Sequence, residues 1–348
     1  MNKEHKKSIR SNFKIELLLN GIARILVGKI LYQKFHIVPP RPPIVVIEVT
    51  NYCNLRCIMC EHSRMKRKKM FIDVDLAKKA LKECADWGIP RVTLSRLGEP
   101  LLHPSLIEII RYAKKVGIRN VSMVCNATLL TEERAREIIL SGLDLISFSV
   151  DANSKETFEK IRPGSNFDDV VSNIKRFIMI RNNLSQKKPW VEINTCLMKE
   201  SLGEVPFVIE SWRPLVDRIK VWPVAPLPQS NNQLIVDCPN QNGEKKPCEI
   251  LWTRLVILSN GQATVCCGDR EGALSVGDLA KMSIRELWKS ERIRLMRKIH
   301  FSKKFDDLPL CKQCFLTDKT WFKSEKEMIG KYGKEWKPLG IFPSSFFS

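Results

Sequence analysis

Three cysteines stand close together in the segment Cys53-Asn54-Leu55-Arg56-Cys57-Ile58-Met59-Cys60, which follows an apolar run. Thiols spaced as C-x3-C-x2-C point into one small volume, where they either pair or share a metal centre. An odd number cannot pair completely, and a closed structural zinc site takes four ligands. A cubane iron–sulfur cluster held by three thiolates leaves one iron open for a non-protein ligand. The alternative is a zinc knuckle or three unrelated buried cysteines.

Length and composition limit the class of protein. The chain has 348 residues, of which 44% are hydrophobic, enough for one large domain and a smaller one. Twelve cysteines could indicate a secreted disulfide scaffold, but the sequence shows no signal peptide and no apolar run of about 18 residues. We therefore expect a cytoplasmic protein without a transmembrane span, in which cysteines serve as metal ligands.

The net charge of +20 favours acidic partners. These include phosphorylated or nucleotide-linked substrates, nucleic acid and an anionic membrane surface, and the charge does not choose among them. Between residues 8 and 36, apolar positions recur at three- and four-residue steps among Lys and Arg. This pattern predicts a basic amphipathic helix that packs on the body of the protein or makes peripheral contact with a membrane. A proline-rich linker at 39–43 then ends the first segment, 1–43.

From residue 44 onward, short apolar runs alternate with helical patterns. The expected strands are 44–50, 91–95, 120–125, 143–150, 191–197 and 218–223. The expected helices are 74–87, 105–116, 132–141, 168–181 and 202–212. Such alternation predicts an α/β fold of parallel strands joined by right-handed crossovers. In barrels of this kind, functional residues lie at the C-terminal ends of the strands.

The cysteine loop after the first strand resembles the signature of the radical S-adenosylmethionine (radical SAM) enzymes. The resemblance implies a partial (β/α)6 radical SAM barrel over residues 44–226, with a [4Fe–4S] cluster on Cys53, Cys57 and Cys60. It also implies that S-adenosylmethionine (SAM) binds the open iron and is cleaved to methionine and a 5′-deoxyadenosyl radical, which takes a hydrogen atom from the substrate. Met59 stands where the family usually has an aromatic residue.

Motifs at the strand ends resemble the SAM-binding positions of that family. Leu97-Gly98-Glu99 corresponds to its Gly-Gly-Glu motif, with Leu97 in place of the first glycine, and Asn126-Ala127-Thr128 resembles its Asn-Gly-Thr stretch. Ser149 and Asp151 project to the same side of a strand, which suits hydrogen bonds to two ribose hydroxyls. The expected SAM contacts are Gly98, Glu99, Asn126, Ser149, Asp151 and Asn194.

Three further positions have narrower expectations. Thr131 is expected to cap the helix that follows it. Arg162, in a stretch that matches the family near its active site, could pair with a carboxylate through two hydrogen bonds. His103 is expected to be structural.

A second set of cysteines lies near the C-terminal end, at Cys248, Cys266-Cys267 and Cys311-Lys312-Gln313-Cys314. Between the first two, the runs 255–258 and 263–265 flank Asn260-Gly261, which predicts a β-hairpin. A helix is expected at 283–298. Four thiolates gathered from these segments could close either an iron–sulfur cluster or a zinc site.

The spacing of the second set resembles the SPASM/Twitch extensions of radical SAM enzymes. The resemblance implies a small α+β domain over residues 245–318, preceded by a linker at 227–244 and followed by an aromatic tail at 319–348. The implied ligands of one auxiliary [4Fe–4S] cluster are Cys248, Cys266, Cys311 and Cys314, with Cys267 as the alternative to Cys266. Four cysteine ligands leave no open iron, which indicates electron transfer.

Taken together, these features predict a radical SAM oxidoreductase. We expect it to oxidise a small sugar-derived or phosphorylated molecule by two electrons, with the auxiliary cluster as electron acceptor and flavodoxin or ferredoxin as reductant. One alternative is a radical SAM maturase that modifies a peptide. The other is a non-catalytic, metal-binding nucleic-acid protein, for which salt-sensitive RNA binding is expected.

Overall fold

The computed structural model describes residues 38–224, 234 and 245–314. The predicted amphipathic helix, most of the predicted linker and the aromatic tail lie outside these residues. Among the helices described, none combines the length and the apolar character that a membrane span requires.

Six parallel strands form the larger part of a nine-stranded sheet, and each follows the sequence-based expectation to within a few residues. They are β1 (Ile44–Ile47), β2 (Arg91–Thr93), β3 (Asn120–Cys125), β4 (Leu145–Ser149), β5 (Trp190–Leu197) and β6 (Arg218–Pro223). The strand order is β6-β5-β4-β3-β2-β1-β7-β8-β9, so the sheet is open, with β6 and β9 as its edges. This open arrangement confirms the predicted partial barrel.

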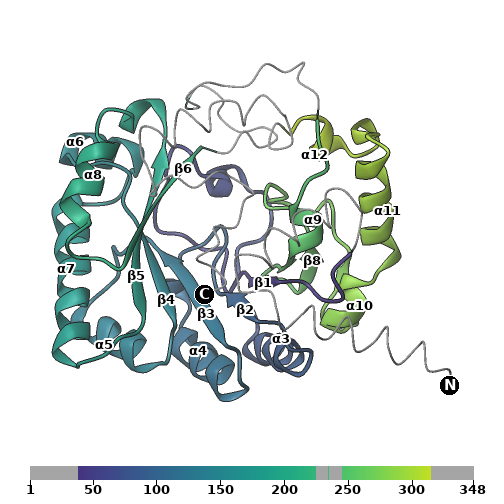
Figure 1. Cartoon of the computed structure of the whole chain (residues 1–348), viewed down its shortest axis with the longest axis horizontal. Helices are drawn as coiled ribbons and strands as arrows, with labels where there is room; N and C mark the ends of the chain where they lie inside the picture. The colour runs from purple at the N-terminus through teal and green to yellow at the C-terminus, as the bar shows by residue number, and fades with distance from the viewer. Residues whose placement is uncertain (1–37, 225–233, 235–244, 315–348) are drawn as a thin grey trace, which may run out of the picture.

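Helices cover the outer face of this sheet (Figure 1). They are α3 (Val74–Asp86), α4 (Leu106–Lys115), α5 (Glu132–Leu140), α6 (Lys155–Ile161), α7 (Phe167–Asn183) and α8 (Val205–Trp212). Thr131 caps α5, as predicted, by accepting a hydrogen bond from the Arg134 backbone N–H. The short helix α6 was not predicted, and it proves to contact the cysteine loop.

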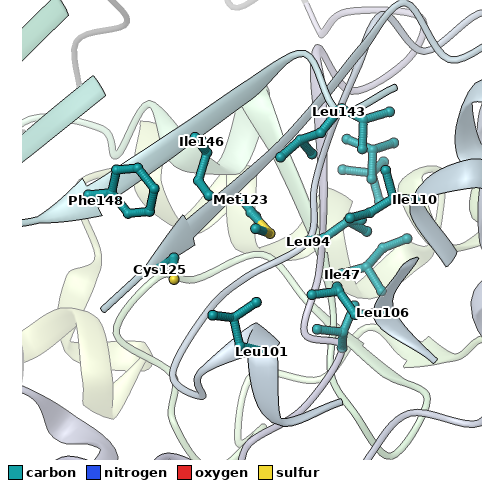
Figure 2. Close-up of a cluster of buried hydrophobic side chains, with 14 of the residues drawn as sticks. Ile47, Leu94, Leu101, Leu106, Ile110, Met123, Cys125, Leu143, Ile146 and Phe148 are labelled. Carbon is teal, nitrogen blue, oxygen red and sulfur yellow. The ribbon is translucent and has the colours of Figure 1, made fainter. Parts of the chain in front are cut away.

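The core lies between the sheet and these helices. Figure 2 shows Ile146 and Phe148 of β4 on this side of the sheet, and Phe148 packs edge-on against Phe177 of α7 with ring centroids 5.4 Å apart. Full burial of each such side chain stabilises the fold by roughly 1.5–3 kcal/mol. Because side chains alternate along a strand, Ser147 and Ser149 of β4 project to the inner face of the sheet.

The predicted hairpin is present as β7 (Arg254–Ile257) and β8 (Gln262–Thr264), followed by β9 (Gly277–Asp278). Strand β7 pairs in parallel with β1, so the hairpin continues the sheet of the barrel. The surrounding helices are α9 (Ile250–Thr253), α10 (Ile284–Trp288), α11 (Glu291–Phe301) and α12 (Pro309–Lys312).

The single helix expected at 283–298 is wrong, because α10 and α11 are separate helices. Ser283 and Glu286 form a capping box at the start of α10. Ser290 then caps α11 by accepting the backbone N–H of Ile293, which requires a non-helical backbone at Ser290. The proline-rich linker packs against this region, where the Trp288 indole N–H donates to the carbonyl of Pro39 over 3.1 Å.

Candidate active site

The first cysteine loop follows β1 and is held by the end of α6. The backbone N–H of Arg56 donates to the carbonyl of Pro163 over 3.2 Å, and that of Ile58 donates to the carbonyl of Ile161 over 3.0 Å. Cys53, Cys57 and Cys60 are all free of disulfide bonds. Three unpaired thiols on one loop suit an iron–sulfur cluster with an open iron.

Burial is the main influence on these thiols. It raises the pKa of Cys53 and Cys57 above the usual value and that of Cys60 to about 12, while the charge of Arg162 acts in the opposite direction on all three. The thiols are therefore protonated at neutral pH, and a cluster that binds them must displace their protons.

Arg162 lies between this loop and the end of β4. Its Nη1 is 3.6 Å from the Cys57 sulfur, while its Nε and Nη2 lie 2.8 Å and 2.6 Å from Oδ2 of Asp151. Burial alone would lower the pKa of Arg162, but Asp151 and Cys57 raise it above the usual range. The other carboxylate oxygen of Asp151 accepts the Cys196 backbone N–H over 2.8 Å. Both oxygens of this predicted ribose ligand thus already have protein partners.

Gly98 and Glu99 pack against the chain just before the first cysteine. A Cβ at Gly98 would lie 2.2 Å from the Thr50 carbonyl oxygen, so only glycine fits there without a shift. The Glu99 carboxylate is buried and accepts backbone N–H groups from Leu101 at 3.1 Å and Asn126 at 2.8 Å. Burial raises the pKa of Glu99 to about 7.

Asn126 also connects to the cysteine loop. Its Nδ2 donates to Oδ1 of Asn54 over 3.0 Å, and its own Oδ1 accepts the Thr128 hydroxyl over 2.7 Å. Ala127, which replaces the glycine of the family motif, has a left-handed φ of 61°. That conformation costs about 1–2 kcal/mol in a residue with a Cβ, so the hydrogen bonds around it must maintain the turn.

The predicted SAM contacts gather at the C-terminal ends of the parallel strands. Glu99 and Asn126 follow the C-terminal ends of β2 and β3, and Ser149 at the end of β4 pairs in register with Asn194 of β5. The cysteine loop follows the C-terminal end of β1, on the same side of the sheet. The structure therefore brings these residues together, and their contacts with SAM stay a prediction.

The second set of cysteines lines a single pocket beside the hairpin. Its walls combine five thiols with apolar side chains of α9, α11 and the segment before α12, including Leu251, Met296 and Leu308. The cysteines are Cys248, Cys266, Cys267, Cys311 and Cys314. Soft thiolates around a dry pocket suit an iron–sulfur cluster. Both Cys266 and Cys267 line it, so the choice between them stays open.

Burial dominates the acidity of this second set as well. It raises the pKa of Cys248 and Cys266 far above the usual value, and that of Cys311 to about 11. Within the described ranges, no three His, Cys, Asp or Glu side chains are arranged to hold a single metal ion. A cubane differs from a single ion in distributing its thiolates over several irons.

The two cysteine sets belong to segments that contact each other. Cys53 follows the C-terminal end of β1, and Cys266 follows β8, the antiparallel partner of β7. Arg96, which lies after β2, donates from Nη2 to the Cys266 carbonyl over 3.4 Å. Arg270, three residues after Cys267, pairs with Glu61, which directly follows Cys60.

A buried carboxylate that the sequence analysis missed connects the barrel to the hairpin region. Glu48, fully buried after β1, contacts Arg67 Nη2 at 2.9 Å and Arg96 Nη1 at 3.4 Å, and accepts the Ser259 N–H at 3.0 Å. Arg96 in turn donates to the carbonyl of Asp269 over 2.6 Å. The available signal was a charged residue within the apolar run 44–50.

Comparisons with known proteins agree with these features. A family model of the radical SAM superfamily matches residues 47–198, and a SPASM model, an iron–sulfur cluster-binding domain, matches residues 248–315. The tungsten-containing aldehyde ferredoxin oxidoreductase cofactor-modifying protein of Pyrococcus furiosus is 29% identical over 198 residues, which cover 55% of this chain and 54% of that relative. The chain thus matches about half the length of this curated relative.

Two solved structures show the same fold. SuiB of Streptococcus suis bound to the precursor peptide SuiA has a TM-score of 0.62 and 16% identity, covering 83% of this chain and 77% of SuiB. BtrN in complex with AdoMet and 2-DOIA has a TM-score of 0.51 and 17% identity, covering 78% of this chain and 92% of BtrN.

Proposed function

Because the chain belongs to the radical SAM superfamily and carries a SPASM domain with an auxiliary iron–sulfur cluster, we propose that it oxidises a small anionic substrate by two electrons. The observation that carries this proposal is the presence of two separate cysteine sets, one on the loop after β1 and one lining a pocket beside the hairpin. They would provide one site that starts a radical reaction and another that accepts an electron.

The proposed residues for the first cluster are Cys53, Cys57 and Cys60, and those for the auxiliary cluster are Cys248, Cys266, Cys311 and Cys314. When bound, the first cluster and SAM would supply a 5′-deoxyadenosyl radical able to take a hydrogen atom from the substrate. The auxiliary cluster would supply an acceptor for the second electron of the oxidation.

Charged residues on the inner face support an anionic substrate. Lys220 Nζ lies 3.1 Å from Glu192 Oε2, and the Ser147 hydroxyl donates to Glu192 Oε1 over 2.8 Å. Arg218 contacts the same carboxylate at 2.5 Å, so a guanidinium and an amine that is protonated below about pH 7 surround one buried anion. Burial lowers the pKa of Lys220 to about 7 despite the neighbouring Glu192. An excess of positive charge at a buried site favours a carboxylate or phosphate ligand.

The sugar-derived or phosphorylated class predicted from the sequence satisfies this requirement. Modification of a peptide is the alternative, because SuiB, solved with a bound precursor peptide, shares the fold at 16% identity.

The decisive experiment uses the full chain, reconstituted anaerobically with iron and sulfide and incubated with SAM and dithionite. We expect about eight irons per chain, as two cubanes require, and release of 5′-deoxyadenosine. Dithionite stands in for the proposed flavodoxin or ferredoxin.

Two variants separate the roles of the cysteine sets. Cys57→Ala should abolish 5′-deoxyadenosine release, whereas Cys311→Ala should retain it and lose only the iron of the auxiliary site. An iron-replete protein that forms no 5′-deoxyadenosine would exclude the enzymatic proposal and leave the nucleic-acid-binding alternative.

A further inference from the structure

His300 is buried beside the second cysteine set, near the end of α11. The residue is only 1% exposed, and its ring lies between two cysteines that are distant in sequence. The backbone N–H of Cys248 is 3.2 Å from Nδ1, and the Cys311 sulfur is 3.3 Å from Nε2. Phe305 packs edge-on against the ring, with centroids 5.0 Å apart, and fixes its plane.

These two contacts determine which ring nitrogen carries the proton. A backbone N–H can only donate, so Nδ1 must accept the hydrogen bond from Cys248. In the neutral ring the proton then resides on Nε2 and is directed at the Cys311 sulfur. The protein alone therefore directs an N–H donor at the Cys311 sulfur.

We infer that His300 is a positioning residue that sets the reduction potential of the auxiliary cluster, by donating an Nε2–H hydrogen bond to the ligating sulfur of Cys311. This inference rests on the proposed function, in which Cys311 is a cluster ligand. Hydrogen bonds to cluster sulfurs are among the features that set the reduction potential. Reduction adds negative charge, which such a donor stabilises, so the potential rises and the site accepts an electron more readily.

A neighbouring cation has a different role at the same turn. Lys245 Nζ donates to the carbonyl oxygens of Cys311 at 3.0 Å and Lys312 at 2.5 Å. Lys245 thereby holds the backbone of α12, whereas His300 contacts the Cys311 sulfur itself. Loss of Lys245 should affect assembly of the site, and loss of His300 should affect its potential.

The test measures the auxiliary cluster alone, in the full chain with Cys53, Cys57 and Cys60 replaced by alanine. An EPR-monitored redox titration gives its midpoint potential. His300→Phe, which keeps a ring but removes both nitrogens, should lower the potential enough to change the oxidised-to-reduced ratio about tenfold, or about 59 mV for a one-electron couple. His300→Gln, whose amide N–H can replace Nε2–H, should recover most of this shift.

His103 provides a matched control. It is also 1% exposed, its Nε2 lies 3.2 Å from the Ile72 carbonyl, and its Nδ1 accepts the Ser105 N–H over 3.1 Å. His103→Phe therefore removes a comparable buried imidazole without changing a cysteine contact. It should leave the potential of the auxiliary cluster unchanged.

An unchanged potential in His300→Phe, with about four irons retained, would overturn the inference. If that variant fails to assemble a cluster, pulsed EPR of the reduced parent protein labelled with ¹⁵N-histidine decides instead. A weak coupling to a histidine nitrogen supports the hydrogen bond. No coupling, a strong coupling typical of direct ligation, or a site without iron overturns it. None of these measurements involves SAM cleavage, so a failure of the proposed reaction is detected separately.

Discussion

Asp151 holds the Arg162 guanidinium through two contacts of 2.8 Å and 2.6 Å, which leaves the remaining nitrogen, Nη1, 3.6 Å from the Cys57 sulfur. The pair therefore connects the end of β4 to the loop that carries the first cysteine set. The sequence analysis expected Arg162 to pair with a carboxylate, without saying which one, and expected Asp151 to bind a ribose hydroxyl of SAM; the structure shows that the carboxylate is Asp151.

Breaking this pair should strongly destabilise the protein. Arg162→Met leaves the buried Asp151 charge without its partner, which typically costs about 3–5 kcal/mol of unfolding free energy. The double variant Asp151→Asn/Arg162→Met removes both charges and should recover much of that loss. Urea denaturation of the three proteins measures the effect. Equal loss in the single and double variants would show that the ion pair is not the cause.

Gly98 should not tolerate a side chain. Gly98→Ala places a Cβ against the Thr50 carbonyl, and the resulting shift should cost about 1–3 kcal/mol and reduce iron incorporation at the first site. Gly203→Ala is the control, because a Cβ at Gly203 meets no atom within 4 Å. Thermal unfolding and iron analysis of both variants check this prediction. It fails if the two substitutions have the same effect.

Lys220 should make stability depend on pH in the alkaline range. Its pKa is about 7 in the folded protein, against 10.5 for the unperturbed side chain, so between these values the unfolded state binds more protons. The unfolding free energy should therefore rise with pH across this window through this group. Lys220→Met should flatten the rise, as measured by denaturation at a series of pH values.

Lys82→Met is the control for this pH series, because Lys82 is 55% exposed and pairs with Asp86 on the surface of α3. Its curve should parallel that of the unmodified protein. If the curve of Lys220→Met also parallels that of the unmodified protein, the lowered pKa of Lys220 is contradicted.

The choice between Cys266 and Cys267 can be resolved by iron analysis. If Cys266 is the fourth ligand, Cys266→Ala should lower the iron content from about eight to about four per chain, whereas Cys267→Ala should retain about eight. Cys84→Ala, at a fully buried core position of α3, serves as the control for loss of a thiol elsewhere. The reverse outcome would assign Cys267 as the ligand.

Local features of the sequence predicted most of the fold. The alternation of apolar runs and helical patterns placed all six barrel strands, and the cap at Thr131 was read from residues adjacent to it. The error at 283–298 arose because periodicity continued across Ser290, while the competing hydrogen bond that ends one helix and starts the next was overlooked.

The sequence by itself determined that three thiols near residue 53 share one site, because covalent spacing restricts them to a small volume. Only the tertiary structure decided that Asp151 pairs with Arg162, that Glu48 joins the barrel to the hairpin region, and that His300 directs a proton at Cys311. Those relationships depend on packing between segments that are separate in the chain. Hydrogen bonds and buried ion pairs form wherever the fold brings their partners within about 3 Å, and no local pattern records that distance.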